Sequence, residues 1–123
     1  MTLGVTELNA VMTSEDSQES LMAPDGLALM KQNAAEAARL MKALGNDSRL
    51  LILCYLGNRE LSVTELNSFL DLSQSALSQH LALLRRDGLV KTRRESQTIY
   101  YSLQGDKAKR LIGTLHDIFC PTL

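Results

Sequence analysis

The most constraining feature of this sequence is a segment of helical character that begins at Ser73 and ends at Gly88. Its apolar positions recur at helical spacing, as Leu77, Leu81 and Leu84, and predict one buried face. Ser73 is suited to cap the first turn and Gly88 to end the last. At about 100° per residue, the opposite face carries small, hydrogen-bonding or cationic side chains that fit a DNA major groove. These are Ser75, Gln79, Ala82 and Arg86, with Ser78 at the edge.

Two short alternating segments follow this helix and predict a hairpin. Residues 89–94 and 98–103 alternate between apolar and polar side chains on either side of the turn residues 95–97. A basic cluster surrounds the start of the hairpin, and within it Asp87 is the opposing charge. The cluster consists of Arg85, Arg86, Lys91, Arg93 and Arg94. Directly after a groove-compatible helix, such a cluster favours contacts to DNA phosphates.

Four further helices are predicted from capping residues and apolar periodicity. Residues 27–44 form an Ala-rich helix with a wide apolar face. Asn46 or Asp47 caps a helix whose residues 50–56 are apolar on every side, so that this helix is expected to be central and buried. Ser62 to Glu65 is a capping-box pattern that opens a short helix through Leu70. Asp106 is expected to cap a last helix that ends before Pro121.

Composition limits the class of protein. A chain of 123 residues with 45% hydrophobic residues suits one domain, and no apolar run approaches the ~20 residues of a membrane span. Residues 1–26 hold five carboxylates and no Lys or Arg, so the rest of the chain is basic despite a net charge of -1. We expect a disordered acidic tail over residues 1–24 and one domain over 25–123. The start lacks the charges of a signal peptide, which favours a cytoplasmic protein.

The predicted order of helix, helix, helix-turn-helix, two-stranded wing and helix describes a mainly α winged helix-turn-helix. Four segments in this order resemble the ArsR family of bacterial repressors. They are Leu44-Gly45-Asn46-Asp47-Ser48-Arg49-Leu50, Leu77-Ser78-Gln79-His80-Leu81, Arg85-Arg86-Asp87-Gly88-Leu89-Val90 and Tyr100-Tyr101-Ser102-Leu103. The match covers roughly residues 30–120. The resemblance implies a homodimer packed through its first and last helices, a recognition helix in the major groove of operator DNA, and an effector that releases the DNA.

Departures from the family pattern argue against a metal effector. Many members hold a soft metal through a Cys-Val-Cys element, where this chain has Ser62-Val63-Thr64. Other members use paired His and carboxylate residues in the last helix, which here offers His116 and Asp117 alone. The other histidine, His80, lies about 60° from the buried stripe of its helix, where a packing or phosphate contact is expected. We therefore expect no metal and no other cofactor.

The two cysteines, Cys54 and Cys120, fall in the predicted second and last helices. Two cysteines in these helices, without a metal motif, make the chain similar to the sulfide-responsive branch of the family typified by SqrR, BigR and HlyU. The tip Glu95-Ser96-Gln97-Thr98 agrees, because it lacks the Gly-Arg common in other branches. The resemblance implies that Cys54 and Cys120 sense reactive sulfur species by forming a polysulfide or disulfide bridge, and that the dithiol form binds DNA.

The hypothesis is a homodimeric repressor of operator DNA, not an enzyme, in which roles follow position. Bases are expected to be read by Ser75, Ser78 and Gln79 with support from Gln74 and His80, and phosphates to be neutralised by Arg86, Lys91, Arg93 and Arg94. Two alternatives stay open, because a free cysteine is also a small apolar residue. One is a constitutive winged-helix DNA binder or anti-repressor without sensing. The other is a thiol-dependent enzyme such as a sulfurtransferase or a thiol peroxidase.

Overall fold

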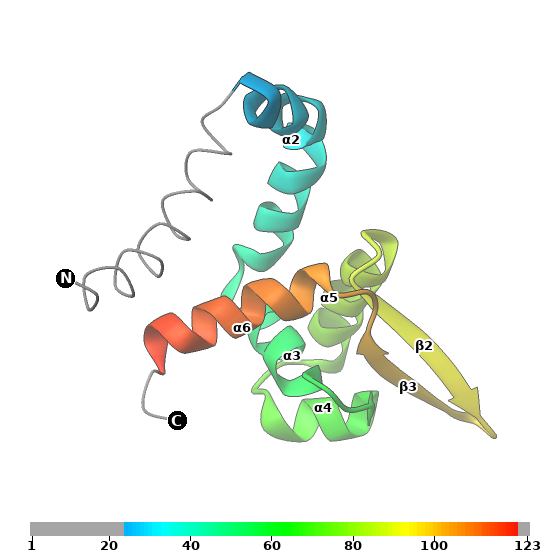
Figure 1. Ribbon diagram of the computed structural model, residues 1–123. Helices are drawn as coiled ribbons and strands as arrows, with labels where there is room; N and C mark the ends of the chain where they lie inside the picture. Colours follow the sequence, from blue (N-terminus) through cyan, green and yellow to red (C-terminus); the bar gives the residue numbers. More distant parts are fainter. Residues whose placement is uncertain (1–23, 121–123) are drawn as a thin grey trace, which may run out of the picture. The chain divides into compact units, whose positions relative to one another are not determined.

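The computed structural model describes residues 24–120, which form helices and one small sheet (Figure 1). The chain divides into two compact units, residues 1–38 and 39–123, and the packing described below lies within the second. In chain order the elements are α2 (Pro24–Leu44), α3 (Asp47–Leu56), β1 (Leu61–Ser62), α4 (Val63–Phe69), α5 (Gln74–Arg86), β2 (Val90–Glu95), β3 (Thr98–Leu103) and α6 (Lys107–Phe119). This order confirms the predicted winged helix-turn-helix. None of the described helices has the length and apolar character needed to cross a lipid bilayer.

Helix α2 begins at Pro24, three residues before the start predicted at residue 27. Proline suits the first turn of a helix, whose N–H groups need no partner within the helix, and Asp25 in that turn complements the helix dipole. The predicted apolar face includes Leu29 and Met30, whose exposed fractions are 60% and 47%. The acidic tail predicted over residues 1–24 lies, up to residue 23, outside the described part of the chain.

Helix α3 is capped as predicted and packs on α5, β3 and α6. The side chain of Asn46 accepts a hydrogen bond from the backbone N–H of Arg49, and Gly57 ends the helix at a φ of 46°. The expectation that every side of this helix is buried is wrong for Leu51, which is 48% exposed, and for Cys54, which is also exposed. These two residues share one face, and the second unit leaves that face uncovered.

The helix-turn-helix forms as predicted. The Ser62 hydroxyl accepts from the N–H of Glu65 at 3.1 Å, and the Glu65 carboxylate accepts from the N–H of Ser62 at 2.8 Å, which completes the capping box of α4. Helix α5 buries Leu77, Leu81 and Leu84 and ends at Arg86, two residues before Gly88, where a φ of 75° suits glycine. The N–H of Leu89 donates back to the carbonyl of Leu84 at 2.9 Å and closes the last turn. These contacts hold α5, the second helix of the helix-turn-helix, against the core.

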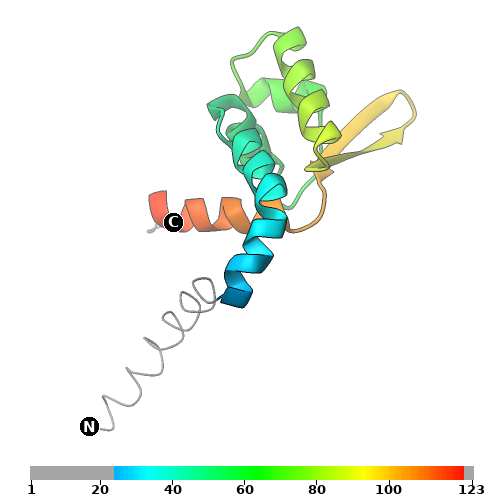
Figure 2. The same ribbon diagram turned by 90° about the horizontal axis from the view of Figure 1, so that it is seen from above.

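The wing contains one strand more than predicted. The sheet order is β1-β3-β2, in which β1 pairs with β3 through Leu61 opposite Tyr101. A two-residue strand leaves no alternation to detect, and Ser62 was already explained as a helix cap. The β2–β3 hairpin runs in register from Val90 opposite Leu103 to Glu95 opposite Thr98. In both views it extends beyond the helices of the second unit (Figure 1 and Figure 2).

Helix α6 covers the predicted range but lacks the predicted cap. Asp106 occupies the N-cap position with helical dihedral angles, and its side chain makes no capping hydrogen bond. Cys120 ends the helix, and its N–H donates to the carbonyl of His116 at 2.7 Å. Ala108 is buried against the core, whereas Ile118 and Phe119 are 61% and 76% exposed. An apolar surface thus remains at the end of this helix.

Candidate nucleic-acid interface and cysteine pair

Helix α5 presents a polar face to solvent, opposite its buried leucines. Every residue predicted on this face is exposed, and Gln74 at the start of the helix is exposed as well. His80 is half-buried at the edge of the face. The hydroxyl of Ser73 accepts from the N–H of Ala76 at 3.1 Å, which satisfies a donor of the first turn. The helix therefore holds hydrogen-bonding side chains on a fixed backbone, as base recognition requires.

The cations around this face differ in how far they are already neutralised. Lys91 and Arg94 are exposed, and no ion pair holds either of them within residues 24–120. The Arg86 side chain is 74% exposed, and its Nε lies 3.5 Å from a carboxylate oxygen of Asp87. A solvent-exposed pair at this distance is weak. These three side chains can exchange water for phosphate oxygens at little cost.

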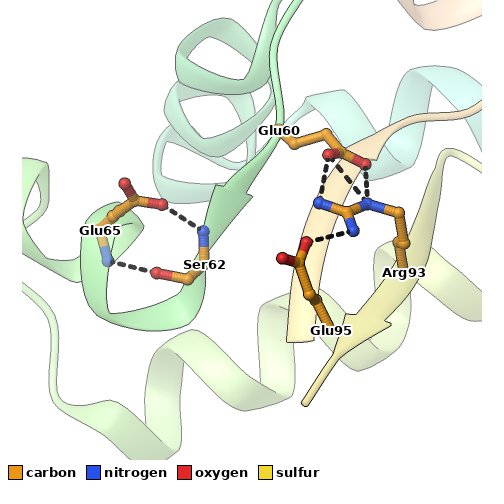
Figure 3. A network of polar contacts seen from close by, with 5 residues as sticks. All are labelled: Glu60, Ser62, Glu65, Arg93 and Glu95. Atoms are coloured by element: carbon orange, nitrogen blue, oxygen red, sulfur yellow. Dashed lines mark hydrogen bonds and ion pairs between the residues drawn. The ribbon is translucent and has the colours of Figure 1, made fainter. Parts of the chain in front are cut away.

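Arg93 is different, because two carboxylates already hold it (Figure 3). Glu60 accepts from its Nε at 3.1 Å and from its Nη2 at 2.9 Å, and Glu95 accepts from Nη1 at 2.7 Å. The guanidinium also lies over the ring of Tyr100, 4.9 Å from the centroid. Glu60 precedes β1, so this contact fastens the hairpin to the chain ahead of the helix-turn-helix. Sequence reasoning missed Glu60, since 33 residues separate it from Arg93.

The network shifts the pKa of both partners. The hydrogen bond from Arg93 lowers the pKa of the Glu60 carboxyl below its ordinary 4.5, and the positive charges of Arg93 and Lys91 act in the same direction. The pKa of Arg93 is raised in turn, chiefly by its hydrogen bonds to Glu60 and Glu95. Both groups are therefore charged at neutral pH. The carboxylates occupy three of the five N–H groups of Arg93, so Arg93 is less available to a phosphate than Arg86, Lys91 and Arg94.

A hollow of about 490 Å³ lies between α5 and β3, beside the polar face. It is lined by Ser78, Ala82, Arg85, Arg86 and Tyr101. Among these, Arg85 was predicted only as a member of the basic cluster, and Tyr101 was not predicted as a functional residue. The signal for Arg85 was present, because it lies seven residues after Ser78 and so on the same side of the helix. Nothing in the sequence alone places Tyr101 beside that side.

The two cysteines lie on α3 and α6, two helices that contact each other within the second unit. Cys54 lies on α3 and is exposed, and Cys120 lies at the end of α6 and is half-buried; both are free thiols. Desolvation raises the pKa of the Cys54 thiol above its ordinary 9.0, and the negative charge of a Cys120 thiolate raises it further. That electrostatic effect requires the two sulfur-bearing side chains to be near one another. Folding thus brings together two cysteines that are far apart in the sequence.

Within the described residues, no group of three or more His, Cys, Asp and Glu side chains is arranged to hold a metal ion. Ser62, the first residue of the Ser62-Val63-Thr64 segment, and Glu65 bind each other's backbone in the capping box (Figure 3). Their side chains are thereby explained without a ligand.

Comparison with known proteins gives a consistent result. The family model described as "Bacterial regulatory protein, arsR family" matches residues 46–92. The chain is 56% identical over 98 residues to the transcriptional activator HlyU of Vibrio cholerae, covering 80% of this chain and 91% of that protein. It is 48% identical to a biofilm growth-associated repressor of Agrobacterium fabrum, covering 76% and 80%.

Solved structures agree with these matches. Reduced HlyU from Vibrio cholerae superimposes with a TM-score of 0.71 at 57% identity, covering 74% of this chain and 96% of that one. A winged helix-turn-helix domain from Mycobacterium bovis, described as homodimeric, superimposes with a TM-score of 0.63 at 30% identity, covering 78% and 85%.

Proposed function

Because the chain belongs to the ArsR family of bacterial regulatory proteins, we propose that it is a dimeric repressor whose operator binding is switched by reactive sulfur. Membership makes it a DNA-binding transcriptional regulator and not an enzyme, so the hypothesis of a thiol-dependent enzyme is wrong. The repressor binds its operator in the cytoplasm while Cys54 and Cys120 are thiols, and a bridge between them releases it. The observation that carries the proposal is that these cysteines lie on α3 and α6, which pack on each other, and the influence of Cys120 on the pKa of Cys54 supports it.

The polar face of α5 enters the major groove. Ser75, Ser78 and Gln79 read base edges, with Gln74 and His80 in support. Arg86, Lys91 and Arg94 neutralise phosphates, and Arg93 joins them when it exchanges its carboxylates for a phosphate. Substitution Gln79→Ala should relax specificity at one base pair at a cost of about 1–3 kcal/mol and spare non-specific binding.

The dimer forms through the first and last helices. Both carry exposed apolar side chains, among them Met30, Met41, Ile118 and Phe119. Large apolar side chains exposed in this way mark a contact with another protein. The homodimeric relative from Mycobacterium bovis supports a second copy of the chain as the partner. A dimer presents two recognition helices to half-sites about 34–36 Å apart, so a small change in their spacing weakens binding.

The switch proceeds by sulfur transfer. One cysteine thiolate attacks the outer sulfur of a persulfide donor, takes up that sulfur, and the donor leaves as a thiolate. The second cysteine attacks the resulting persulfide and expels hydrogen sulfide, so that sulfane sulfur is reduced while the two cysteines are oxidised. Each further sulfur transferred before closure lengthens the bridge by an S–S bond of roughly 2 Å. The bridge ties α3 to α6 and changes the placement of the recognition helices.

A DNA-binding assay with and without a persulfide donor tests the proposal. The wild type should bind an operator duplex as the dithiol and lose affinity after treatment, with mass added in multiples of sulfur between the two cysteines of one chain. Cys54→Ser and Cys120→Ser should each stay bound. If either variant is still released, or if the bridge joins two chains, the proposed switch is wrong. A wild type that binds DNA but ignores the donor is a constitutive binder or anti-repressor without sensing.

A further inference from the structure

The hollow between α5 and β3 has the chemistry of a phosphate site. Arg85 and Arg86 supply positive charge, and Ser78 and Tyr101 supply hydroxyl donors. Ala82 lies between Ser78 and Arg85 on α5, and its small side chain keeps the hollow open. These groups belong to two elements that adjoin the DNA-binding face; the predictions gave Arg85 no role beyond membership of the basic cluster and gave Tyr101 no role.

Of the two arginines, Arg85 has the side chain whose charge is not neutralised by a neighbouring carboxylate among the described residues. Arg86 is partly neutralised by Asp87, whereas Arg85 has no ion-pair partner within residues 24–120. The hydroxyl of Tyr101 likewise makes no hydrogen bond in the described part of the chain. Tyr101 is nevertheless held in place, because β3 is the central strand and pairs Tyr101 with Leu61 on one side and Thr92 on the other. A cation and a hydroxyl therefore face the hollow without partners of their own.

The position of the hollow indicates which anion it meets. A helix in the major groove is flanked on both sides by sugar–phosphate backbone. Ser78, Ala82 and Arg85 follow one edge of the polar face of α5 at spacings of four and three residues, so this edge faces a backbone when the polar face enters the groove. The hollow has room for a phosphodiester group and its bridging water.

We propose that the hollow binds one phosphate of the DNA backbone per half-site, with Arg85 as the cation and the Tyr101 hydroxyl as the neutral donor. The inference rests on the proposed function, because it needs α5 to lie in the major groove. It makes the central strand of the sheet part of the DNA interface and couples the position of the recognition helix to the sheet.

The test pairs protein variants with neutralised phosphates. Duplexes selected from a random pool by the wild type are remade with a single methylphosphonate at each backbone position in turn. One substitution per half-site, beside the recognition helix, should weaken wild-type binding about tenfold or more. Tyr101→Phe and Arg85→Gln should each weaken binding to the natural duplex and lose sensitivity at that same position, because the contact is already absent.

Lys91→Gln serves as the matched control, since it removes a neighbouring exposed cation outside the hollow and should keep the sensitivity at that position. Ala82→Leu should fill the hollow and weaken binding to all sequences alike, with an unchanged circular dichroism spectrum because residue 82 is exposed. If the loss of affinity caused by Tyr101→Phe and the loss caused by the methylphosphonate add up at every backbone position, the assignment is wrong.

A second experiment distinguishes a DNA phosphate from a free anion as the ligand of the hollow. Inorganic phosphate is titrated against the DNA-free protein at constant ionic strength, with tyrosine fluorescence as the readout. Saturation below 1 mM phosphate, about the scale of physiological anions, that disappears in Arg85→Gln would make the hollow a site for a free anion and overturn the DNA assignment. If the wild type selects no duplex at all, the proposed function itself fails, whereas selection without coupling at Tyr101 refutes this inference alone.

Discussion

Glu60 accepts its hydrogen bonds from a single guanidinium, and this contact makes the attachment of the hairpin depend on pH. Its carboxyl pKa is lower in the folded protein than its ordinary 4.5. A lowered pKa stabilises the folded state above pH 4.5, and the stabilisation is lost as pH falls through the folded value. Because the pair is exposed to solvent, the effect is modest and sensitive to salt.

We therefore expect Glu60→Gln to be less stable than the wild type at pH 7, with a difference that shrinks below about pH 4.5. Urea denaturation between pH 7 and pH 3 measures it. The same substitution in an Arg93→Gln background should have no effect, since the partner is gone. A difference that persists at the acid end would mean that Glu60 acts through packing rather than charge.

Cys54 is the second residue whose ionisation reports on structure. Its thiol pKa is raised, first by desolvation and then by the charge of Cys120. Cys120→Ser removes that charge and should bring the pKa of Cys54 down, though not to its ordinary 9.0, because desolvation remains. Thiolate absorbance against pH, recorded for each single-cysteine variant and the wild type, measures the shift. An identical Cys54 titration with and without Cys120 would show that the two thiols are too far apart to form the switch.

At the scale of single elements, local signals predicted most of the fold. Two features depend only on residues close in sequence: the capping box of Ser62 and Glu65, and the leucine spacing of α5. Both could therefore be predicted without knowledge of tertiary contacts. Strand β1 was missed because two residues form a strand only when β3 arrives beside them. The exposed face at Leu51 and Cys54 was missed because an all-apolar segment does not reveal which of its sides the rest of the chain will cover.

The candidate site divides in the same way. Exposure of the polar face of α5 follows from the periodicity of one helix. The partners of Arg93 and the position of Tyr101 beside Arg85 depend on how the sheet docks, which involves residues far apart in the sequence. The prediction that Cys54 pairs with Cys120 rests mainly on the family resemblance.

The tip of the hairpin stores backbone strain at one residue. Ser96 has a φ of 57° in the two-residue turn that joins β2 to β3. A left-handed conformation costs a residue with a Cβ atom roughly 1–2 kcal/mol, whereas glycine adopts it freely. Ser96→Gly should therefore raise the stability of the protein by up to about 1 kcal/mol after the entropy that glycine loses on folding.

Denaturation in urea measures that gain, and Gln97→Gly is the matched control. Gln97 does not have a positive φ, so glycine there should lower stability. If both substitutions have the same effect, the strain at Ser96 does not contribute to stability.

At the scale of the whole molecule, the described chain separates two kinds of apolar residue. Leu53, Leu66 and Leu77 are fully buried and hold the second unit together, whereas Ile118 and Phe119 at the end of α6 are mostly exposed. A monomer gains little from such exposed side chains, so their contribution to stability depends on a second copy of the chain. Folding and assembly should therefore respond to different substitutions.

Phe119→Glu tests this separation, because it places a charge in the proposed interface and removes no contact from the buried core. We expect the variant to sediment as a folded monomer at micromolar concentration, where the wild type is a dimer, and to bind an operator far more weakly, since one recognition helix then acts without the other. Asn58→Glu, which introduces the same charge at an exposed position after α3, should leave both assembly and binding intact.

A Phe119→Glu protein that stays dimeric would place the interface elsewhere. A protein that unfolds instead would mean that the end of α6 belongs to the core, so the two outcomes distinguish assembly from folding.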